Sequence, residues 1–368
     1  MKVPYVDLPG QYAAQKEHIL EAIDRVLSSG QYILSNEVEK FETRFAELCQ
    51  AKHAIGVANG TDSLILAMKV MGIGQGDEVI TAPNSWISSA SSIALCGAIP
   101  VFADVGEDQN LDPKSVERVI TKRTKAIMPV HLTGRIAPMN PLMELAKSNR
   151  LLILEDAAQA VGSKYHDKMA GSMGDISSFS LHPLKNLNGC GDAGILTTNN
   201  DEFANQLKLL RNHGQISRNI ITTWGFNSRL DAIQAAVLNY RLTILDQIIE
   251  KRRANAALYY QHLHSAIKTP PSTKGYFDTY HLFVIQVEKR NELKDFLKKH
   301  QISTAIHYPT PLHLQAACAY LGYKEGDFPE TEKQSKQILS IPVHHMLSDE
   351  QIIFVAQKIN EFYGWPCH

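Results

Sequence analysis

Short apolar runs alternate with helical segments along the first 200 residues, and this alternation constrains the fold more than any other feature. Because strands that alternate with helices favour a doubly wound, mostly parallel sheet, we predict such a sheet here. Ligands of such sheets bind beyond the carboxyl ends of the strands. The predicted strands are residues 53–58, 77–82, 99–104, 126–131, 151–156, 175–180 and 195–198, and helical spacing marks residues 63–71, 113–120, 142–149 and 201–212.

The chain divides into a large part and a smaller part. Its 368 residues and 44% hydrophobic content suffice for a large core and for two or three domains. We predict a large domain over 1–240, which includes helices at 16–27 and 36–49, and a small C-terminal α/β domain over 241–368. One or two long helices over 231–263 connect the two parts, and the small domain includes the connecting helix. It also contains strands at 281–287, 304–307 and 341–343, and helices at 291–299, 333–339 and 348–362.

Charge and composition exclude several classes of protein. Lys and Arg number 37 against 38 Asp and Glu, so no basic surface predicts nucleic-acid binding. We find no signal-peptide pattern, and no apolar run approaches the roughly 20 residues of a membrane helix. The five cysteines are odd in number and scattered, as in reduced cytoplasmic proteins, and the absence of CxxC and HExxH argues against a metal site.

One lysine lies between two apolar strands. Residues 177–194 run from a β-prone segment through a polar, glycine-containing loop that carries Lys185 into a second β-prone segment. A lysine held between buried strands is costly unless it is neutralised, paired or covalently modified. One chemistry that needs such a lysine is a Schiff base with an aldehyde cofactor. The alternative is an ordinary solvated loop lysine.

Two further motifs strengthen the functional interpretation of Lys185. The apolar run 151–154 leads to Asp156, which is placed where a cofactor ring could lie. A carboxylate there can keep a pyridine nitrogen protonated, so Asp156 and Lys185 together are the pair that a pyridoxal phosphate enzyme needs. Asn59-Gly60-Thr61-Asp62 opens a helix, and a helix start is either a phosphate site or an ordinary N-cap.

These motifs occur in the order found in a known family. Glu155-Asp156-Ala157-Ala158-Gln159 and the run Ser180-Leu181-His182-Pro183-Leu184-Lys185-Asn186-Leu187 resemble the DegT/DnrJ/StrS family of pyridoxal phosphate-dependent sugar aminotransferases. The resemblance extends to Asn59–Leu64, Gly225–Arg229, His307-Tyr308-Pro309 and Pro311-Leu312-His313, and it covers nearly the whole chain. It implies the aspartate aminotransferase-like fold of fold-type I enzymes and a homodimer with composite active sites.

The resemblance also implies roles for individual residues. Lys185 would bind the cofactor and move the proton, and Asp156 would stabilise the charge on its ring. Further cofactor contacts are implied for Gly60, Thr61 and Ser180 at the phosphate, Trp86 on the ring face, Gln159 at the ring oxygen and Asn227 at the phosphate of the neighbouring subunit. Arg229 lies near the family position for the donor carboxylate, although a salt bridge that caps the next helix is an equal alternative.

The substrate side of the site is less defined. His307, Tyr308 and His313 lie in the loop that the family places at the substrate entrance, and a plain surface loop is the alternative. The predicted reaction transfers an amino group from glutamate or glutamine to a keto sugar, for which we expect a nucleotide-linked 3-keto- or 4-keto-6-deoxyhexose. The alternatives are a non-catalytic sensor or regulatory protein, an aminocyclitol aminotransferase and a sugar dehydratase. Dehydratases of the family replace the lysine with histidine.

This chain departs mildly from the family pattern at two positions. Ser35 stands where relatives often have glycine, and Gly191-Asp192-Ala193-Gly194 stands where many have Gly-Glu-Gly-Gly. We assign no role to Ser35, and the second departure could mark a substrate subgroup.

Overall fold

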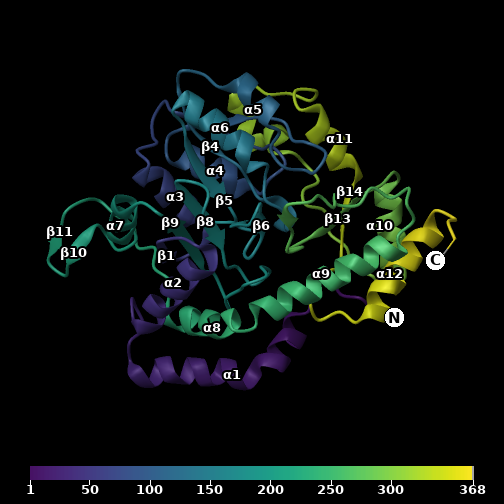
Figure 1. The fold of residues 1–368 in the computed structure, drawn as a ribbon, viewed down its shortest axis with the longest axis horizontal. Helices are drawn as coiled ribbons and strands as arrows, with labels where there is room; N and C mark the ends of the chain where they lie inside the picture. Colours follow the sequence, from purple (N-terminus) through teal and green to yellow (C-terminus); the bar gives the residue numbers. More distant parts are fainter. Residues whose placement is uncertain (367–368) are drawn as a thin grey trace.

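A seven-stranded sheet forms the centre of the computed structural model, which describes residues 1–366 (Figure 1). Its strand order is β1-β9-β8-β5-β4-β2-β3. The strands are β1 His53–Val57, β2 Glu78–Thr81, β3 Ile99–Phe102, β4 Thr124–Met128, β5 Leu152–Asp156, β8 Ile176–Ser180 and β9 Gly194–Thr198.

All neighbouring strands of this sheet run parallel except where β9 is involved. β9 is antiparallel to both β1 and β8, because it follows β8 directly through the loop that carries Lys185. The other pairs, β2–β3, β2–β4, β4–β5 and β5–β8, are parallel. The expected doubly wound, mostly parallel sheet of a fold-type I enzyme is confirmed.

Helices cover both faces of the sheet, which explains why its strands read as continuous apolar runs. Ile153 and Leu154 are neighbours on β5 but belong to different hydrophobic clusters, since successive strand side chains point to opposite faces. The surrounding helices are α2 Asn36–Cys49, α3 Gly60–Val70, α4 Ile87–Leu95, α5 Pro113–Val119, α6 Met139–Asn149 and α7 Asp201–Leu210.

The C-terminal part has its own core around a two-stranded antiparallel sheet. Its elements are α9 Leu245–His262, β13 Phe283–Gln286, α10 Arg290–Lys299, α11 Pro329–Gln337, β14 Ile338–Ile341 and α12 Asp349–Phe362. Val3 packs into this same core, so the N-terminal residues lie beside the C-terminal part (Figure 1). Helix α1 Leu8–Ser29, which follows Val3 along the chain, packs along α8 Ala232–Leu242. The division at residue 240 stays a prediction.

Three predicted elements in this part differ from the structure. The helix predicted over 333–339 begins at Pro329 and ends at Gln337, and residues 338–341 form the strand that was predicted at 341–343. Hydrogen bonding across the sheet outweighs the helical apolar spacing there. The strand predicted over 304–307 reduces to one bridge between Ala305 and Ser340.

Several short elements were not predicted, because they are too short to show a periodic pattern in the sequence. A hairpin of β10 Gln215–Ser217 and β11 Ile220–Ile221 extends away from the molecule at the left of Figure 1. A small sheet joins β6 Lys164–Tyr165, β7 Lys168–Met169 and β12 Tyr276–Phe277. Three 3₁₀ turns complete the structure: η1 Leu132–Gly134, η2 Leu312–Leu314 and η3 Ala316–Leu321.

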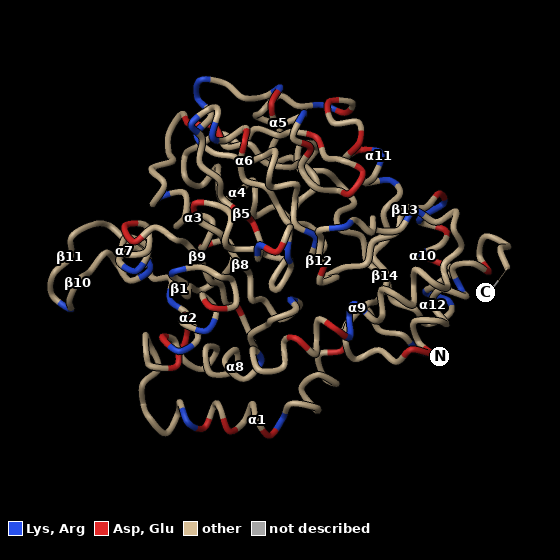
Figure 2. The backbone as a smooth tube through the Cα atoms, in the orientation of Figure 1, with Lys and Arg blue, Asp and Glu red and all other residues tan. Residues whose placement is uncertain are grey.

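Charged residues of both signs are interspersed over the backbone (Figure 2). This agrees with the near-zero net charge of the chain. Within residues 1–366, no helix is both long enough and apolar enough to cross a membrane.

Candidate active site

A cavity of about 570 Å³ opens beyond the carboxyl ends of β5 and β8. This is the edge where the sequence predicted a ligand site. The cavity brings together most of the predicted site residues: Gly60, Thr61, Trp86, Asp156, Gln159, Ser180, Lys185, His307 and Tyr308. Asn227, Arg229 and His313 lie outside it.

The loop that carries Lys185 is fixed by residues from distant parts of the chain. Leu181 N–H donates to the carbonyl of Ala193 at 2.8 Å, which closes the base of the loop. Arg241 on α8 donates to the carbonyl of Asn188 at 2.6 Å, and Gln11 on α1 donates to the side chain of Asn188 at 3.1 Å. No local sequence pattern connects Arg241 or Gln11 with this loop, because they lie 53 and 177 residues away from Asn188.

Lys185 and Asp156 titrate away from their usual ranges. Burial lowers the pKa of Lys185 to about 8, although the negative charge of Asp156 opposes this shift. Burial raises the pKa of Asp156, and a hydrogen bond from Ser89 and the charge of Lys185 partly offset it. A lysine pKa near 8 leaves an appreciable fraction of neutral amine near pH 7, which is the form that attacks an aldehyde.

Two serines of α4 and the loop before it orient Asp156. Ser89 Oγ donates to Asp156 Oδ2 at 2.8 Å, and Ser85 lies within hydrogen-bond distance of Ser89 at 2.8 Å. The backbone N–H of Ala158 donates to Asp156 Oδ1 at 3.3 Å. Sequence reasoning missed Ser89, because a serine inside a helix resembles an ordinary packing residue.

Glu155 anchors the same strand from the opposite face of the sheet. Its fully buried carboxylate accepts hydrogen bonds from Gly174 N–H at 2.6 Å, Ser177 Oγ at 2.7 Å and His131 Nε2 at 2.9 Å. Ala137 N–H donates to His131 Nδ1 at 3.2 Å, so Nε2 carries the proton that faces Glu155. Burial alone would raise the pKa of Glu155, yet these hydrogen bonds and His131 lower it. The pair holds the strand end that presents Asp156.

The start of α3 forms part of the cavity wall. Asn59 caps this helix by accepting from the N–H of Asp62 at 2.8 Å, and Thr61 Oγ1 lies 2.8 Å from Ser88 Oγ. A Cβ on Gly60 would lie 2.9 Å from the Cβ of Ser180, so only glycine allows this close approach. Free N–H groups and hydroxyls therefore converge on one side of the cavity, where they could hold a phosphate.

Two further predicted cofactor contacts, Gln159 and Trp86, also line the cavity. Gln159 Oε1 accepts from the N–H of Thr133 at 2.7 Å, which fixes the orientation of its amide. Trp86 is 57% exposed, with its ring 5.6 Å from that of Tyr308. An aromatic face left open beside Asp156 can stack on a planar ring.

Asn227 and Arg229 lie at the base of the β10–β11 hairpin. Asn227 forms an isolated bridge with Asn212, and Arg229 Nη1 donates to Asn212 Oδ1 at 3.1 Å. Arg229 therefore pairs with an amide rather than with the carboxylate that the salt-bridge alternative required.

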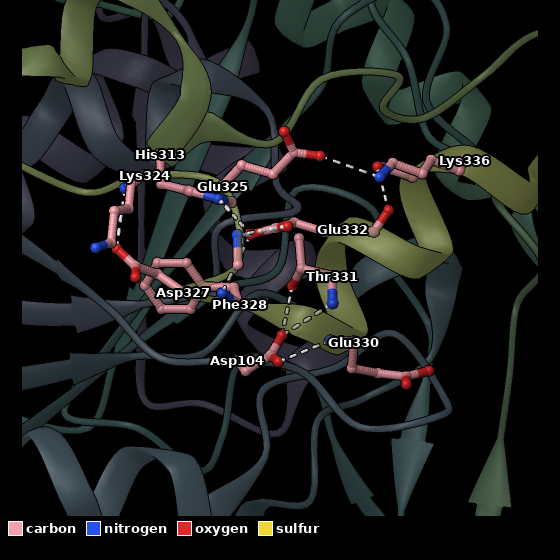
Figure 3. Close-up of polar contacts among 12 residues, drawn as sticks. Asp104, His313, Lys324, Glu325, Asp327, Phe328, Glu330, Thr331, Glu332 and Lys336 are labelled. Carbon is pink, nitrogen blue, oxygen red and sulfur yellow. Dashed lines mark hydrogen bonds and ion pairs between the residues drawn. The ribbon is translucent and has the colours of Figure 1, made fainter.

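His313 is buried away from the cavity. Its Nε2 lies 3.0 Å from Glu332 Oε1, and its ring packs against Phe328 at 4.7 Å (Figure 3). Glu332 also accepts from the N–H of Gly326 at 2.9 Å. The structure does not bring His313 to the substrate entrance, because this buried carboxylate holds its ring inward.

The residues that line the cavity match the needs of pyridoxal phosphate. A lysine, a carboxylate, an open aromatic face and a helix-start cradle correspond to the aldehyde, ring nitrogen, ring face and phosphate of that cofactor. Together with the mostly parallel sheet, they define a protein of the fold-type I class of pyridoxal phosphate enzymes.

The chain belongs to the DegT/DnrJ/EryC1/StrS aminotransferase family, whose model matches residues 13–360. It is 43% identical to a "pleiotropic regulatory protein" of Geobacillus stearothermophilus, covering 99% of both chains. It is 41% identical to a dTDP-3-amino-3,4,6-trideoxy-alpha-D-glucose transaminase of Streptomyces venezuelae, covering 98% of this chain and 96% of the relative. The crystal structure of DesV from S. venezuelae with a ketimine intermediate superposes with a TM-score of 0.96 at 41% identity, covering 98% of each chain.

Proposed function

We propose that this protein is a pyridoxal phosphate-dependent aminotransferase that moves an amino group from glutamate or glutamine to a nucleotide-linked keto sugar. The observation that carries the proposal is the meeting of Lys185 and Asp156 in one cavity with the cradle of Gly60 and Thr61. The sugar transaminase of S. venezuelae supports the substrate class. A 3-keto- or 4-keto-6-deoxyhexose remains the expected acceptor.

Each residue of the cavity has a distinct task in this proposal. Pyridoxal phosphate, when bound, supplies an electron sink for the electrons of the broken C–H bond. Asp156 would keep the proton on the ring nitrogen, while Gly60, Thr61 and Ser180 would hold the phosphate. The neutral amine of Lys185 takes the proton from the α-carbon of the donor at Nζ and later returns a proton for the acceptor.

We infer that the enzyme works as a homodimer with composite sites. Ile216, Ile220, Ile221 and Trp224 of the hairpin region are 61%, 54%, 61% and 93% exposed, an apolar surface that favours burial against another chain. Asn227 and Arg229 adjoin this hairpin and lie outside their own cavity, which supports their use in the site of a neighbouring subunit. Free thiols at Cys49, Cys96, Cys190 and Cys318 support a cytoplasmic location; Cys367 lies outside the described residues.

The alternatives differ from this proposal in testable ways. The name of the Geobacillus relative speaks for a regulatory protein, but a non-catalytic protein has no need of a lysine with a lowered pKa beside Asp156. A dehydratase of this family would carry histidine at position 185. An aminocyclitol aminotransferase would share the donor reaction and differ in the acceptor.

An absorbance spectrum of the purified protein tests the proposal. We expect a visible or near-ultraviolet band that shifts when glutamate is added, and borohydride treatment without glutamate should attach the cofactor to Lys185, as peptide mass spectrometry would reveal. Lys185→Arg should lose the shift and turnover, with a drop of at least about 10³-fold because proton transfer is lost.

Lys208→Arg, an exposed lysine on α7, serves as the matched control and should leave the spectrum and turnover unchanged. A protein without a band after incubation with pyridoxal phosphate would refute the enzymatic proposal and favour the regulatory alternative. A band that shifts with glutamate but no turnover of any nucleotide-linked keto sugar would point to the aminocyclitol alternative.

A further inference from the structure

Arg252 on α9 is a buried cation in the wall of the cavity. Its side chain is 5% exposed, and it lines the cavity together with Tyr5, His281 and His344. Burial lowers the pKa of Arg252 to about 10, and the ionisable partner that opposes this shift is the phenol of Tyr5 rather than a carboxylate. A guanidinium withdrawn from water needs an opposing charge or a full set of acceptors.

The hydrogen-bond partners of Arg252 supply neither an opposing charge nor a full set of acceptors. Its Nη1 donates to the carbonyls of Tyr280 at 3.0 Å and His281 at 3.3 Å, while its Nε has no hydrogen-bond partner within residues 1–366. Arg135, which is equally buried, instead donates to the carboxylate of Asp278 at 2.8 Å. Arg252 therefore differs from Arg135 in forming no ion pair with a carboxylate of the described residues, although it lines the same cavity as Asp156.

The groups around Arg252 add no negative charge. Burial raises the pKa of Tyr5 far above its usual range, so the phenol stays neutral. Burial lowers the pKa of His281 well below its usual range, and its Nδ1 has no partner within the described chain. A carboxylate placed here would meet a cation and neutral polar groups rather than another anion.

His281 lines the same cavity as the two cations Lys185 and Arg252. After burial, the charges of Lys185 and then Arg252 lower the pKa of His281, which places its ring near both. Because Lys185 and Arg252 line one cavity, a substrate that reacts at Lys185 can place an anionic group at Arg252 without leaving that cavity. A dicarboxylic amino acid has this form, since its second carboxylate lies several bonds from the reacting carbon.

We propose that Arg252 binds the side-chain carboxylate of the amino donor, so that the donor is glutamate rather than glutamine. This inference rests on the aminotransferase function proposed above and names a specificity residue for it. The two carbonyl acceptors orient the guanidinium, and Tyr5, whose ring stacks on His307 at 5.9 Å, closes the same end of the cavity.

Binding of unreactive analogues tests the proposal without turnover. Calorimetric titration of the protein, saturated with pyridoxal phosphate, compares glutarate with its uncharged diamide, glutaramide. We expect glutarate to bind at least about tenfold more tightly, since one charge-assisted hydrogen bond accounts for such a ratio. Equal affinities for the two compounds in the unmodified protein would overturn the proposal, whether or not any variant folds.

Variants then assign the preference to Arg252. Arg252→Gln should weaken glutarate binding about tenfold or more and leave glutaramide binding unchanged. The glutarate affinity of Arg252→Lys should lie between those of the unmodified protein and Arg252→Gln. Arg253→Gln is the matched control, because Arg253 follows on the same helix but donates to the carbonyl of Asp278 at 2.7 Å and does not line the cavity. A folded Arg252→Gln protein with unchanged glutarate affinity would contradict the proposal.

Titration with a nucleotide tests whether Arg252 binds the carboxylate of the donor or the diphosphate of the acceptor. Titration with dTDP reports the diphosphate of a sugar nucleotide, and we expect Arg252→Gln to leave its affinity unchanged. A loss of dTDP binding with glutarate binding intact would show that Arg252 binds the acceptor instead, and the proposal would be wrong. The absorbance band that requires Lys185 is measured independently, so its absence would refute the enzymatic function without deciding the anion site.

Discussion

Lys185 carries an ammonium group that the surrounding protein disfavours. Part of its side chain faces the open cavity, yet burial still lowers the pKa of Lys185 to about 8. The unfolded chain has no such burial, so its lysine keeps the ordinary pKa of about 10.4. Between these two values the unfolded state binds more protons than the folded state, and the folded protein gains stability as pH rises.

This difference predicts that Lys185→Met stabilises the cofactor-free protein. At pH 7 Lys185 is protonated in the unfolded state and mostly protonated in the folded state, so most of the cost of the buried charge is present. We expect a gain of about 2 kcal/mol at pH 7, allowing for the solvent in the cavity, and a shrinking gain as pH rises from 8 towards 10.5. Urea denaturation at pH 7 and pH 10 measures it.

Lys208→Met on the surface of α7 is the control and should change stability little at either pH. A Lys185→Met protein that is less stable than the unmodified protein at pH 7 would show that the ammonium group is not strained by its surroundings.

At the scale of elements, α11 depends on a carboxylate from another segment. Phe328 precedes this helix and provides no side-chain cap. Instead, Asp104 in the loop after β3 accepts from the N–H groups of Glu330 and Thr331, both at 3.0 Å (Figure 3). Thr331 Oγ1 also donates to Asp104 at 2.7 Å, so one loop of the large sheet holds the first turn of α11.

Asp104→Ala should therefore loosen α11 in particular. We expect a loss of about 1–2 kcal/mol in the free energy of unfolding, as for other lost helix caps. Amide hydrogen exchange over residues 329–337 should become faster, because the first N–H groups of the helix lose their acceptor. Mass spectrometry of exchanged peptides measures the local change.

Asp112→Ala provides the comparison, since Asp112 caps α5 by accepting from the N–H of Ser115 at 3.0 Å. It should cost similar stability while exchange over 329–337 stays unchanged. If Asp104→Ala also leaves exchange in that segment unchanged, the remote cap does not hold the helix.

At the scale of the whole molecule, the β10–β11 hairpin leaves several large apolar side chains exposed within the structure described for residues 1–366. Trp224 is 93% exposed and Ile220 is 54% exposed, which is costly for groups of this size in water. The proposed dimer would cover them and would bring Asn227 to the neighbouring cavity. Cofactor affinity and association should then be linked.

Replacement of both side chains, Ile220→Ser with Trp224→Ser, should shift the protein towards the monomer. We expect the dimer to weaken by at least about tenfold, because burial of these two apolar side chains in an interface contributes several kcal/mol to association. Sedimentation equilibrium measures the association, and titration with pyridoxal phosphate should show weaker binding at dilutions where the variant is monomeric.

Tyr320→Ser is the control, because Tyr320 on η3 is 66% exposed and lies far from the hairpin in sequence. It should leave the dimer intact. An unmodified protein that sediments as a monomer would refute the composite site, and a double variant that stays fully dimeric would place the interface elsewhere.

The sequence by itself determined the sheet and the ends of its strands. Alternating apolar runs predict parallel strands, and the carboxyl ends of such strands converge at one edge of the sheet. Asp156, Ser180 and Lys185 meet in the cavity for this reason, and Gly60 joins them because its helix starts at the same edge. These arguments need only local patterns and the geometry common to all such sheets.

The tertiary structure alone decided which distant residues complete the site. Ser89, Arg241 and Arg252 reach the cavity or its loop through contacts between segments that no local pattern connects. His313 was predicted at the substrate entrance, but a buried hydrogen bond with Glu332 holds its ring away from the cavity. Periodicity reports the face that a side chain takes on its own element, whereas its partner depends on how elements pack against each other.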